Sequence, residues 1–261
     1  MFTPTTIKPL TAADRATYEW QMWSAGVGEA GQEKLKNATV LISRTGGVGS
    51  VVAYELAAAG VGKLVIIHGG VVRPSDLNRQ LLMTHQSLGS PRIESVRARL
   101  LDLNPELEIV GLGEHADQDN VFPLAEQENV DVIVDCAPMF AERFALSDAS
   151  LRLKKPMVEC GMYDMEAQLT TFLPGQTPCL RCLFPEPPST WKRQFPVFGA
   201  VAGSIGAMAA TEVIKLIAGV GQPLFGRWLH CDFREMRFRT LQIDRRNDCP
   251  FCGDLVPDSH P

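Results

Sequence analysis

Two pairs of cysteines have the residue types and spacing of a metal site. Two residues separate Cys179 from Cys182, and two separate Cys249 from Cys252. Each pair can present both thiolates to one ion, and four thiolates complete the tetrahedral shell of zinc without leaving a position for a substrate. The pattern therefore predicts a structural zinc site that clamps the chain end onto the body. The alternative is a set of reduced surface thiols, or a redox pair, which needs only one such motif near a helix start.

A cluster of glycines forms a second candidate site. Gly46, Gly47 and Gly49 follow an apolar run at residues 39–43 and precede an Ala-rich helix that we expect at 50–59. Backbone N–H groups and the helix dipole attract a phosphate at such a helix start, and glycine lets the phosphate approach closely. The sequence predicts a nucleotide-binding loop here. The alternative is a helix that simply packs tightly on its strand.

The elements that position these groups alternate along the first part of the chain. Nearly continuous apolar strands separated by helices indicate a parallel sheet buried on both faces. Beyond residue 163 the pattern changes to an antiparallel one, with a proline-rich segment at 184–196 that we expect to be an exposed loop. The expected strands are 39–43, 63–68, 107–111, 131–135, 156–160, 167–173, 225–232 and 236–243, and the expected helices are 14–23, 50–59, 90–103, 141–154 and 198–218.

Composition narrows the class of protein. The chain has 261 residues, 45% of them apolar, with a formal net charge of -5. This acidity argues against a nucleic-acid-coating protein. The longest apolar candidate, residues 200–210, is about half of the roughly 20 residues that a membrane span needs. The N-terminus lacks the apolar core of a signal peptide, so we expect a cytoplasmic protein.

The three remaining cysteines bring the total to seven, an odd number that argues against a disulfide framework. Cys136 and Cys160 stand at the ends of apolar strands, and Cys231 stands within one. We expect all three to be buried structural thiols.

Several motifs in one order resemble the ubiquitin-activating enzyme superfamily, in its bacterial branch of MoeB, ThiF and HesA. The resemblance covers about residues 15 to 253, and the details at 43–44, 73–84 and 135–138 are most similar to HesA. The matching stretches are 46–50 (GGVGS), 56–62 (LAAAGVG), 75–80 (SDLNRQ), 89–95 (GSPRIES), 135–136 (DC), both cysteine pairs and 212–215 (EVIK).

The resemblance implies a single Rossmann-like α/β domain over residues 1–261. It would have an N-terminal arm (1–38), a nucleotide-binding half (39–165) and a zinc-containing C-terminal half (166–261). Its mainly parallel, twisted sheet would carry an antiparallel C-terminal extension. Family members are homodimers whose N-terminal segment crosses to the partner, so we expect a homodimer.

The activity that the resemblance implies is adenylation of a carboxylate with ATP, in sulfur or molybdenum/metal-cofactor biosynthesis. The carboxylate is typically the C-terminal Gly-Gly of a small β-grasp sulfur carrier. It attacks the α-phosphate, which gives an acyl-adenylate and pyrophosphate. Arg79 and Arg92 are the expected catalytic residues. The expected nucleotide-binding residues are Arg44, Gly46, Gly47, Gly49, His68, Asn78, Arg79, Gln80, Arg92 and Asp135.

The sequence departs from the family pattern at the acidic positions. His68-Gly69-Gly70 replaces an Asp-x-Asp motif, and Pro138 replaces the aspartate that holds magnesium. These changes remove hard oxygen ligands and count against magnesium. The missing acidic residue after the second strand also counts against a dehydrogenase. Trp20 stands in place of an arginine that reaches the partner subunit, and we expect it to pack rather than to bind phosphate.

The arginines leave two interpretations. Arg44 replaces the first glycine of the loop, and Arg92 replaces a lysine, with a planar fork in place of a point charge. In the first interpretation Arg44, Arg79 and Arg92 rebuild a phosphate clamp for adenylation. In the second, the protein is a non-catalytic zinc scaffold that recruits a partner.

Each of these residues also has a purely structural alternative. Arg44 would be a surface cation, Arg79 would pair with Asp76, and His68 would be a satisfied histidine at a strand end. Some relatives carry an acceptor cysteine on a crossing loop, but segment 184–196 has none, so we expect no thioester intermediate. Residues 191–193 (WKR) on that segment would either meet an anionic partner or form a solvated tip.

Overall fold

One mixed sheet of eight strands runs through the computed structural model, which describes residues 7–255. The outer ends of the predicted arm and C-terminal half, residues 1–6 and 256–261, lie outside the described part. The strand order is β3-β2-β1-β4-β5-β6-β7-β8. The strands are β1 (Thr39–Ser43), β2 (Lys63–Ile67), β3 (Glu108–Leu112), β4 (Val132–Asp135), β5 (Met157–Tyr163), β6 (Glu166–Phe172), β7 (Arg227–Asp232) and β8 (Arg237–Gln242).

The two halves of this sheet differ in direction. Strands β1 to β5 pair in parallel. Strands β5 to β8 pair antiparallel, and β7 and β8 form the expected hairpin. The predicted α/β fold, a mainly parallel sheet with an antiparallel C-terminal extension, is confirmed.

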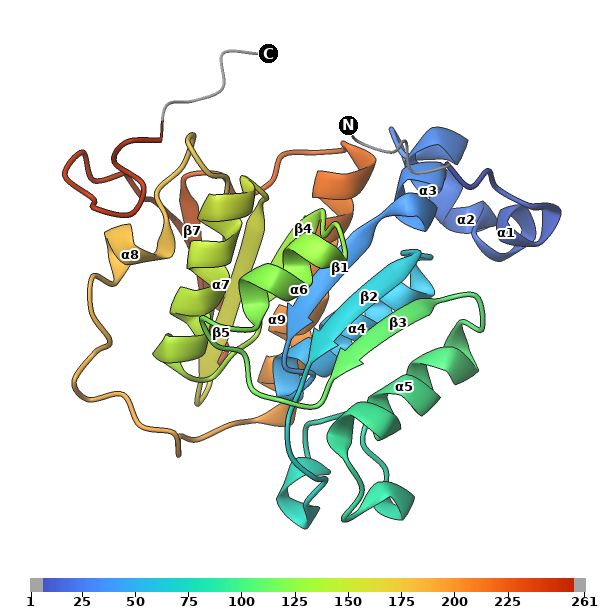
Figure 1. Cartoon of the computed structure of the whole chain (residues 1–261), viewed down its shortest axis with the longest axis horizontal. Coiled ribbons are helices and arrows are strands. Elements are labelled where there is room, and N and C mark those ends of the chain that lie inside the picture. The colour runs from blue at the N-terminus through green and yellow to red at the C-terminus, as the bar shows by residue number, and fades with distance from the viewer. Residues whose placement is uncertain (1–6, 256–261) are drawn as a thin grey trace.

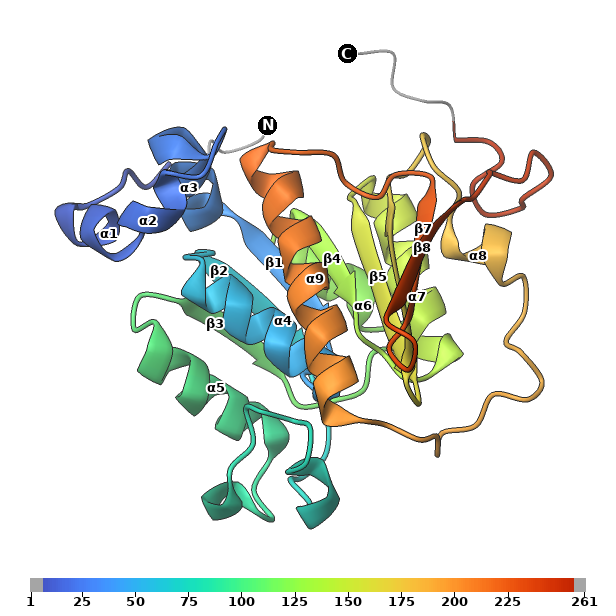
Figure 2. The same cartoon turned by 180° about the vertical axis from the view of Figure 1, so that it is seen from behind.

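Helices cover both faces of the parallel part. Helices α4 (Gly47–Ala58), α5 (Arg92–Leu103) and α9 (Gly199–Ala218) pack on one face, and α6 (Val121–Gln127) and α7 (Phe140–Leu153) on the other (Figures 1 and 2). Successive residues of β1 serve opposite cores: Val40 and Ile42 lie in the α4–α9 core, and Leu41 lies in the α6–α7 core. A strand buried on both faces must be apolar at every position, which explains the continuous apolar runs.

Several helix boundaries differ from the expectation. The predicted helix 14–23 is two short helices, α1 (Ala12–Thr17) and α2 (Glu19–Met22), which break at Tyr18. The Tyr18 ring packs against Gly60, where an added Cβ would lie 2.5 Å from it. Helix α3 (Gly28–Asn37) was not predicted, because this polar segment buries Leu35 as its one large apolar side chain.

Trp20 contradicts the expectation that it packs. The residue is 77% exposed, and among residues 7–255 its ring stacks on that of Trp23, with ring centroids 6.3 Å apart. The two indoles lie on α2 and just after it, on an arm that projects from the body (Figure 2). The arm therefore carries an aromatic surface that the rest of the described chain does not cover.

Helix α9 is longer than the apolar stretch expected at 200–210. Its 20 residues are long and apolar enough to cross a membrane, with a mean hydropathy of 1.5 in the best window. In this fold, however, 44% of that window is buried in the protein. The helix lies across the sheet beside α4 (Figure 2), so its apolar composition serves the α4–α9 core.

The contact between α4 and α9 depends on a glycine. A Cβ added at Gly206 would lie 2.6 Å from the carbonyl oxygen of Val48 and 3.0 Å from the Cβ of Val51. A Cβ at Gly203, one turn earlier, would meet only a Val51 methyl at 3.7 Å. Because the obstruction at Gly206 includes backbone, the two helices must separate to admit a methyl group there.

We therefore predict opposite effects for two alanine substitutions on α9. Gly206→Ala should lower the free energy of unfolding by about 1–3 kcal/mol, because it overpacks the helix contact. Gly203→Ala should leave it unchanged or raise it by up to about 1 kcal/mol, because alanine is the better helix former. Urea unfolding followed by circular dichroism measures both, and equal effects would contradict the proposed role of Gly206.

Candidate functional site

A cavity of about 280 Å³ opens at the C-terminal ends of the parallel strands. Residues that follow β1, β2 and β4 line it, together with residues of β5 and of the segment that leads into α9. The strand order reverses beside β1, and ligands of open α/β sheets bind at such a point. The fold therefore places the expected ligand site where the topology favours one.

The glycine loop contributes the N-terminus of α4. Gly46 is the N-cap residue, and Gly46, Gly47 and Val48 line the cavity. Gly49 does not line it; its backbone packs under the loop, where a Cβ would lie 1.9 Å from the carbonyl oxygen of Arg44. The loop thus presents the positive end of a 12-residue helix to the cavity, as an anion site requires.

Arg44 is buried, so the interpretation as a surface cation is wrong. Its Nε donates to Oε2 of Glu142 on α7 at 2.6 Å, and its Nη2 pairs with Oε1 of the same carboxylate. The guanidinium lines the cavity with this partner behind it. Arg44 has a φ of 62°, a left-handed conformation that costs a non-glycine residue about 1–2 kcal/mol. The buried ion pair offsets that strain.

Asp76 organises the next group of site residues. Its carboxylate pairs with Arg92 Nη2 at 2.8 Å, accepts a hydrogen bond from Gln80 Nε2 at 2.8 Å, and lies 3.8 Å from Arg79 Nη2. Arg79, Gln80 and Arg92 line the cavity, whereas Asn78 accepts from Arg79 outside it. The predicted pairing of Arg79 with Asp76 is present but long. The Arg79 guanidinium faces the cavity as well.

His68 lies on the cavity wall as a neutral group. Its Nδ1 is 2.8 Å from the hydroxyl of Thr45, and the side chain is buried. Burial, helped by the cations Arg92 and Arg44, lowers the pKa of His68 to about 3. The imidazole therefore carries no charge at neutral pH, in agreement with the satisfied strand-end histidine.

Asp135 lies beneath the cavity rather than on its wall. The residue is fully buried, and its Oδ1 accepts from the backbone N–H of Ala137 at 2.9 Å. Burial raises the pKa of Asp135 to about 7, although Arg143 opposes the shift. Arg143 itself pairs with Glu159 and lies 3.7 Å from Asp135.

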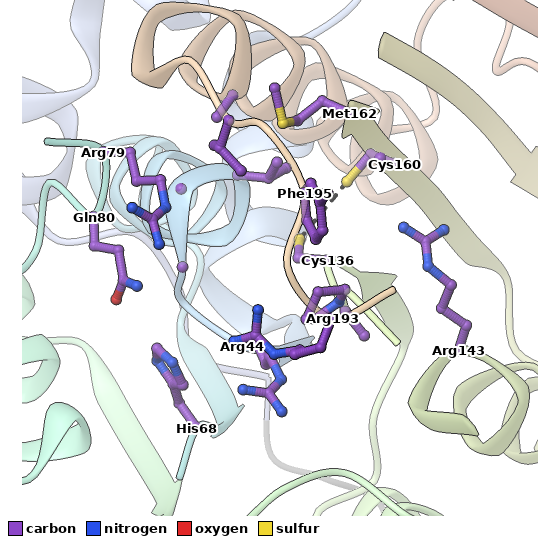
Figure 3. Close-up of a pocket in the computed structure, with 18 of the residues that line it drawn as sticks. Arg44, His68, Arg79, Gln80, Cys136, Arg143, Cys160, Met162, Arg193 and Phe195 are labelled. Atoms are coloured by element: carbon purple, nitrogen blue, oxygen red, sulfur yellow. Dashed lines mark hydrogen bonds between the residues drawn. The ribbon is translucent and has the colours of Figure 1, made fainter. Parts of the chain in front are cut away.

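Sequence reasoning missed two arginines of this cavity. Arg143 and Arg193 bring the arginines on its wall to five, and Figure 3 shows them with Arg44 and Arg79. Arg143 lies three residues into α7, so its placement needed the fold. Arg193 was noted only as part of the segment 191–193.

The segment 184–198 has no helix or strand and is largely exposed, as expected for 184–196, and several of its residues also line the cavity. Trp191 donates its Nε1–H to the carbonyl of Pro138 at 2.7 Å and packs its ring 5.7 Å from that of Phe140. Arg193 and Phe195 then line the cavity (Figure 3). We call this stretch the crossing segment, since it passes along the strand ends to α9 (Figure 1).

Two of the remaining cysteines meet at the cavity. The sulfurs of Cys136 and Cys160 lie 3.7 Å apart, and both residues line the wall (Figure 3). Cys160 is buried as expected, but Cys136 is only half-buried because it faces the cavity. Cys231 is fully buried between β6 and β8, as expected.

The two cysteine pairs converge on one point. Their sulfurs lie within 4.8 Å of one another, at 3.5 Å for Cys182–Cys252, 3.8 Å for Cys179–Cys249 and 3.9 Å for Cys179–Cys182. A tetrahedral shell with metal–sulfur bonds of about 2.3 Å has sulfurs about 3.8 Å apart. These buried thiols therefore form a donor set that could hold a metal.

We predict that Glu142 is needed chiefly because Arg44 is buried. Glu142→Ala should lower the free energy of unfolding by about 3–5 kcal/mol, because it leaves an unpaired buried guanidinium. In an Arg44→Gly background, Glu142→Ala should lower the free energy of unfolding much less. Glycine also suits the left-handed backbone at position 44. A double-mutant cycle by chemical denaturation measures the coupling, and equal costs in both backgrounds would contradict it.

Comparison with known proteins agrees with this architecture. The ThiF family matches residues 18–251. The heterocyst protein HesA of Trichormus variabilis is 43% identical over 248 residues, which cover 95% of this chain and 92% of that protein. The adenylyltransferase and sulfurtransferase MOCS3 of Aedes aegypti is 39% identical over 253 residues, which cover 95% of this chain and 57% of that protein.

Solved structures show the same fold. Escherichia coli MccB with ATP superposes with a TM-score of 0.75 at 25% identity, over 86% of this chain and 69% of that one. The microcin C7 biosynthetic enzyme MccB in complex with N-formylated MccA superposes with a TM-score of 0.80 at 22% identity, over 93% and 76%. By the sequence match over most of its length, this chain belongs to the ThiF family.

Proposed function

We propose that this protein binds ATP in the arginine-lined cavity and activates a carboxylate by adenylyl transfer. It would be a HesA-like activating protein of sulfur or molybdenum/metal-cofactor biosynthesis, in the cytoplasm. The similarity to HesA and to the adenylyltransferase and sulfurtransferase MOCS3 supports this function. So does the solved complex of MccB with ATP.

The observation that carries the proposal is the α4 N-terminus, which opens into a cavity with five arginines. A carboxylate oxygen would attack the α-phosphorus, the bond to the bridging oxygen would break, and pyrophosphate would leave. Arg79 and Arg92, with the N–H groups of α4, would stabilise the charge that develops on the phosphate oxygens. The protein's part in this reaction is therefore to bind, orient and neutralise.

A second cavity supports a peptide-like substrate. It measures about 170 Å³ and lies under the crossing segment beside β5, β6 and β7. It shares Arg143, Gly161 and Trp191 with the first cavity, so a chain end could extend from one to the other. The C-terminal Gly-Gly of a sulfur carrier has the slender shape for this path. MccB, solved in complex with N-formylated MccA, offers a parallel.

We further propose a homodimer. The aromatic surface of Trp20 and Trp23 on the N-terminal arm is exposed in the single chain. At the other end of the molecule Phe198, which comes just before α9, is also more than half exposed, as is Leu81. A second copy of the chain would bury this apolar area.

The alternative function is a non-catalytic scaffold. A specific observation favours it: Asp76, Glu142 and Glu159 are already paired with arginines, and Pro138 stands on the cavity wall. A protein of this kind would bind a nucleotide or a partner without turnover.

The four converging thiols are proposed as a structural zinc site, and the prediction is about one zinc per chain. Cys179→Ser should lose the metal and lower the free energy of unfolding by several kcal/mol, because metal binding contributes directly to folding. Elemental analysis and thermal unfolding measure both effects. Cys136→Ser, which removes a thiol outside the cluster, is the control and should keep the metal. A fully stable, metal-free wild-type protein would contradict the proposal.

Adenylation predicts exchange of labelled pyrophosphate into ATP, measured with and without magnesium. Exchange should depend on a carrier that ends in Gly-Gly. It should fall about 100-fold in Arg79→Gln, because one preorganised cation is lost at the phosphate. Lys192→Gln, which changes a charge outside the cavity, is the matched control and should exchange like wild type.

Two results separate the candidate functions. Carrier-dependent exchange supports the adenylating enzyme. Tight binding of ATP or of the carrier without exchange, in either buffer, supports the scaffold.

A further inference from the structure

The carboxylates nearest the cavity are all engaged by protein groups. Asp76 holds Arg92 at 2.8 Å and also accepts from the backbone N–H of Arg73 at 3.0 Å. The Glu142 carboxylate accepts hydrogen bonds from Nε and Nη2 of Arg44. Glu159 pairs with Arg143 and accepts from Gln168 Nε2 at 2.9 Å. None of these three carboxylates lines the cavity in the part of the chain that the structure describes.

The fourth carboxylate, that of Asp135, is kept from the cavity by burial. Asp135 is fully buried beneath the wall, and this burial raises the pKa of its carboxyl to about 7, which disfavours the charged form that a metal ion needs. The backbone oxygen of Pro138, which does lie on the wall, already accepts the Trp191 indole N–H. Proteins hold magnesium through carboxylates together with substrate phosphates. No carboxylate of residues 7–255 lines the wall. The residues present do not fit a protein-held magnesium ion.

Positive charge, in contrast, is in excess. Arg193 forms no ion pair or hydrogen bond within residues 7–255. Arg79 donates from Nη1 to the carbonyl of Ser75 and to Oδ1 of Asn78, and its Nη2 has only a long contact of 3.8 Å with Asp76. Burial lowers the pKa of Arg193, and repulsion from Arg44, Arg79 and Arg92 lowers it further, although the Glu142 carboxylate opposes the shift. An anion in the cavity would relieve that repulsion and accept charge-assisted hydrogen bonds from Arg193 and from Nη2 of Arg79.

We propose that the cavity binds a polyphosphate as its metal-free anion, neutralised by Arg79 and Arg193, and not as a magnesium complex. The proposal rests on the proposed nucleotide site for the identity of the ligand as ATP, but its charge argument applies to any polyphosphate. A magnesium complex would bring a second cation into an already cationic site. The metal-free anion brings only the charge that the site lacks.

The test is calorimetric titration of the purified protein with ATP and, separately, with inorganic tripolyphosphate. Each titration is run in EDTA and in excess magnesium. We expect each polyphosphate to bind in EDTA. When magnesium complexes about nine-tenths of the ligand, the apparent affinity should be about tenfold weaker, because only the metal-free tenth can bind. Affinity that appears or increases with magnesium would overturn the proposal.

Two neighbouring variants on the crossing segment make the test specific. Arg193→Gln should weaken binding in EDTA about tenfold, because it removes a charge-assisted hydrogen bond. Lys192→Gln removes the same charge one residue away, outside the cavity wall, and should bind within about twofold of wild type by the screening of exposed charges. Equal losses in both variants, or no loss in either, would overturn the assignment of Arg193.

The titration with tripolyphosphate distinguishes a failure of this proposal from a failure of the proposed function. Binding of tripolyphosphate but not of ATP in EDTA would support the anion site and reject the nucleotide function. Binding of neither ligand in either buffer would reject both. Magnesium-free binding of ATP without pyrophosphate exchange would support the anion site within the scaffold alternative.

Discussion

Buried arginine–carboxylate pairs are the contacts on which the cavity depends. Glu142 joins α7 to the residue after β1 through Arg44, and Asp76 joins the turn at 74–76 to α5 through Arg92. Glu159 joins β5 to α7 through Arg143. Because a buried charge is stable only beside its partner, each pair fixes the distance between two elements. The walls of the cavity are therefore positioned by charge pairing as well as by apolar packing.

The same pairs determine the chemistry that the cavity can perform. A carboxylate that neutralises an arginine is no longer available to a metal ion, and His68 is kept neutral by burial. Within residues 7–255, the positive charge that no close carboxylate offsets lies at the end of α4, on Arg193, and on Arg79 at 3.8 Å from Asp76. The preference of the cavity for an anion therefore depends on where the carboxylates point. The number of arginines alone would not have predicted this preference.

Local patterns in the sequence predicted the parts of the fold that local physics controls. The apolar strands, the glycine loop and the convergence of both cysteine pairs are present as expected, because each depends on neighbouring residues or on a metal geometry. The partner of Arg44 is Glu142, 98 positions away, and no periodicity relates the two. For the same reason the contacts of the crossing segment with the cavity and the place of Arg143 on its wall could not be predicted. Helix α3 was missed because its sequence is too polar to show a helical stripe.

The cysteine cluster lies away from the cavity, yet the chain connects the two. The crossing segment begins two residues after Cys182 and ends at α9, so one end is held by the cluster and the other by the α4–α9 contact. The cluster is in turn fixed to α7 through Arg181, whose guanidinium lies 4.0 Å from the Phe144 ring and pairs with Asp148. Helix α9 packs at Gly206 against the Val48 carbonyl, within the first turn after the glycine loop. Because both ends of the crossing segment are fixed in this way, Trp191 and Arg193 stay at the cavity. The residues between the two ends need few further contacts with the body of the protein. The cysteine cluster is therefore part of what builds the site, although no atom of it touches the cavity.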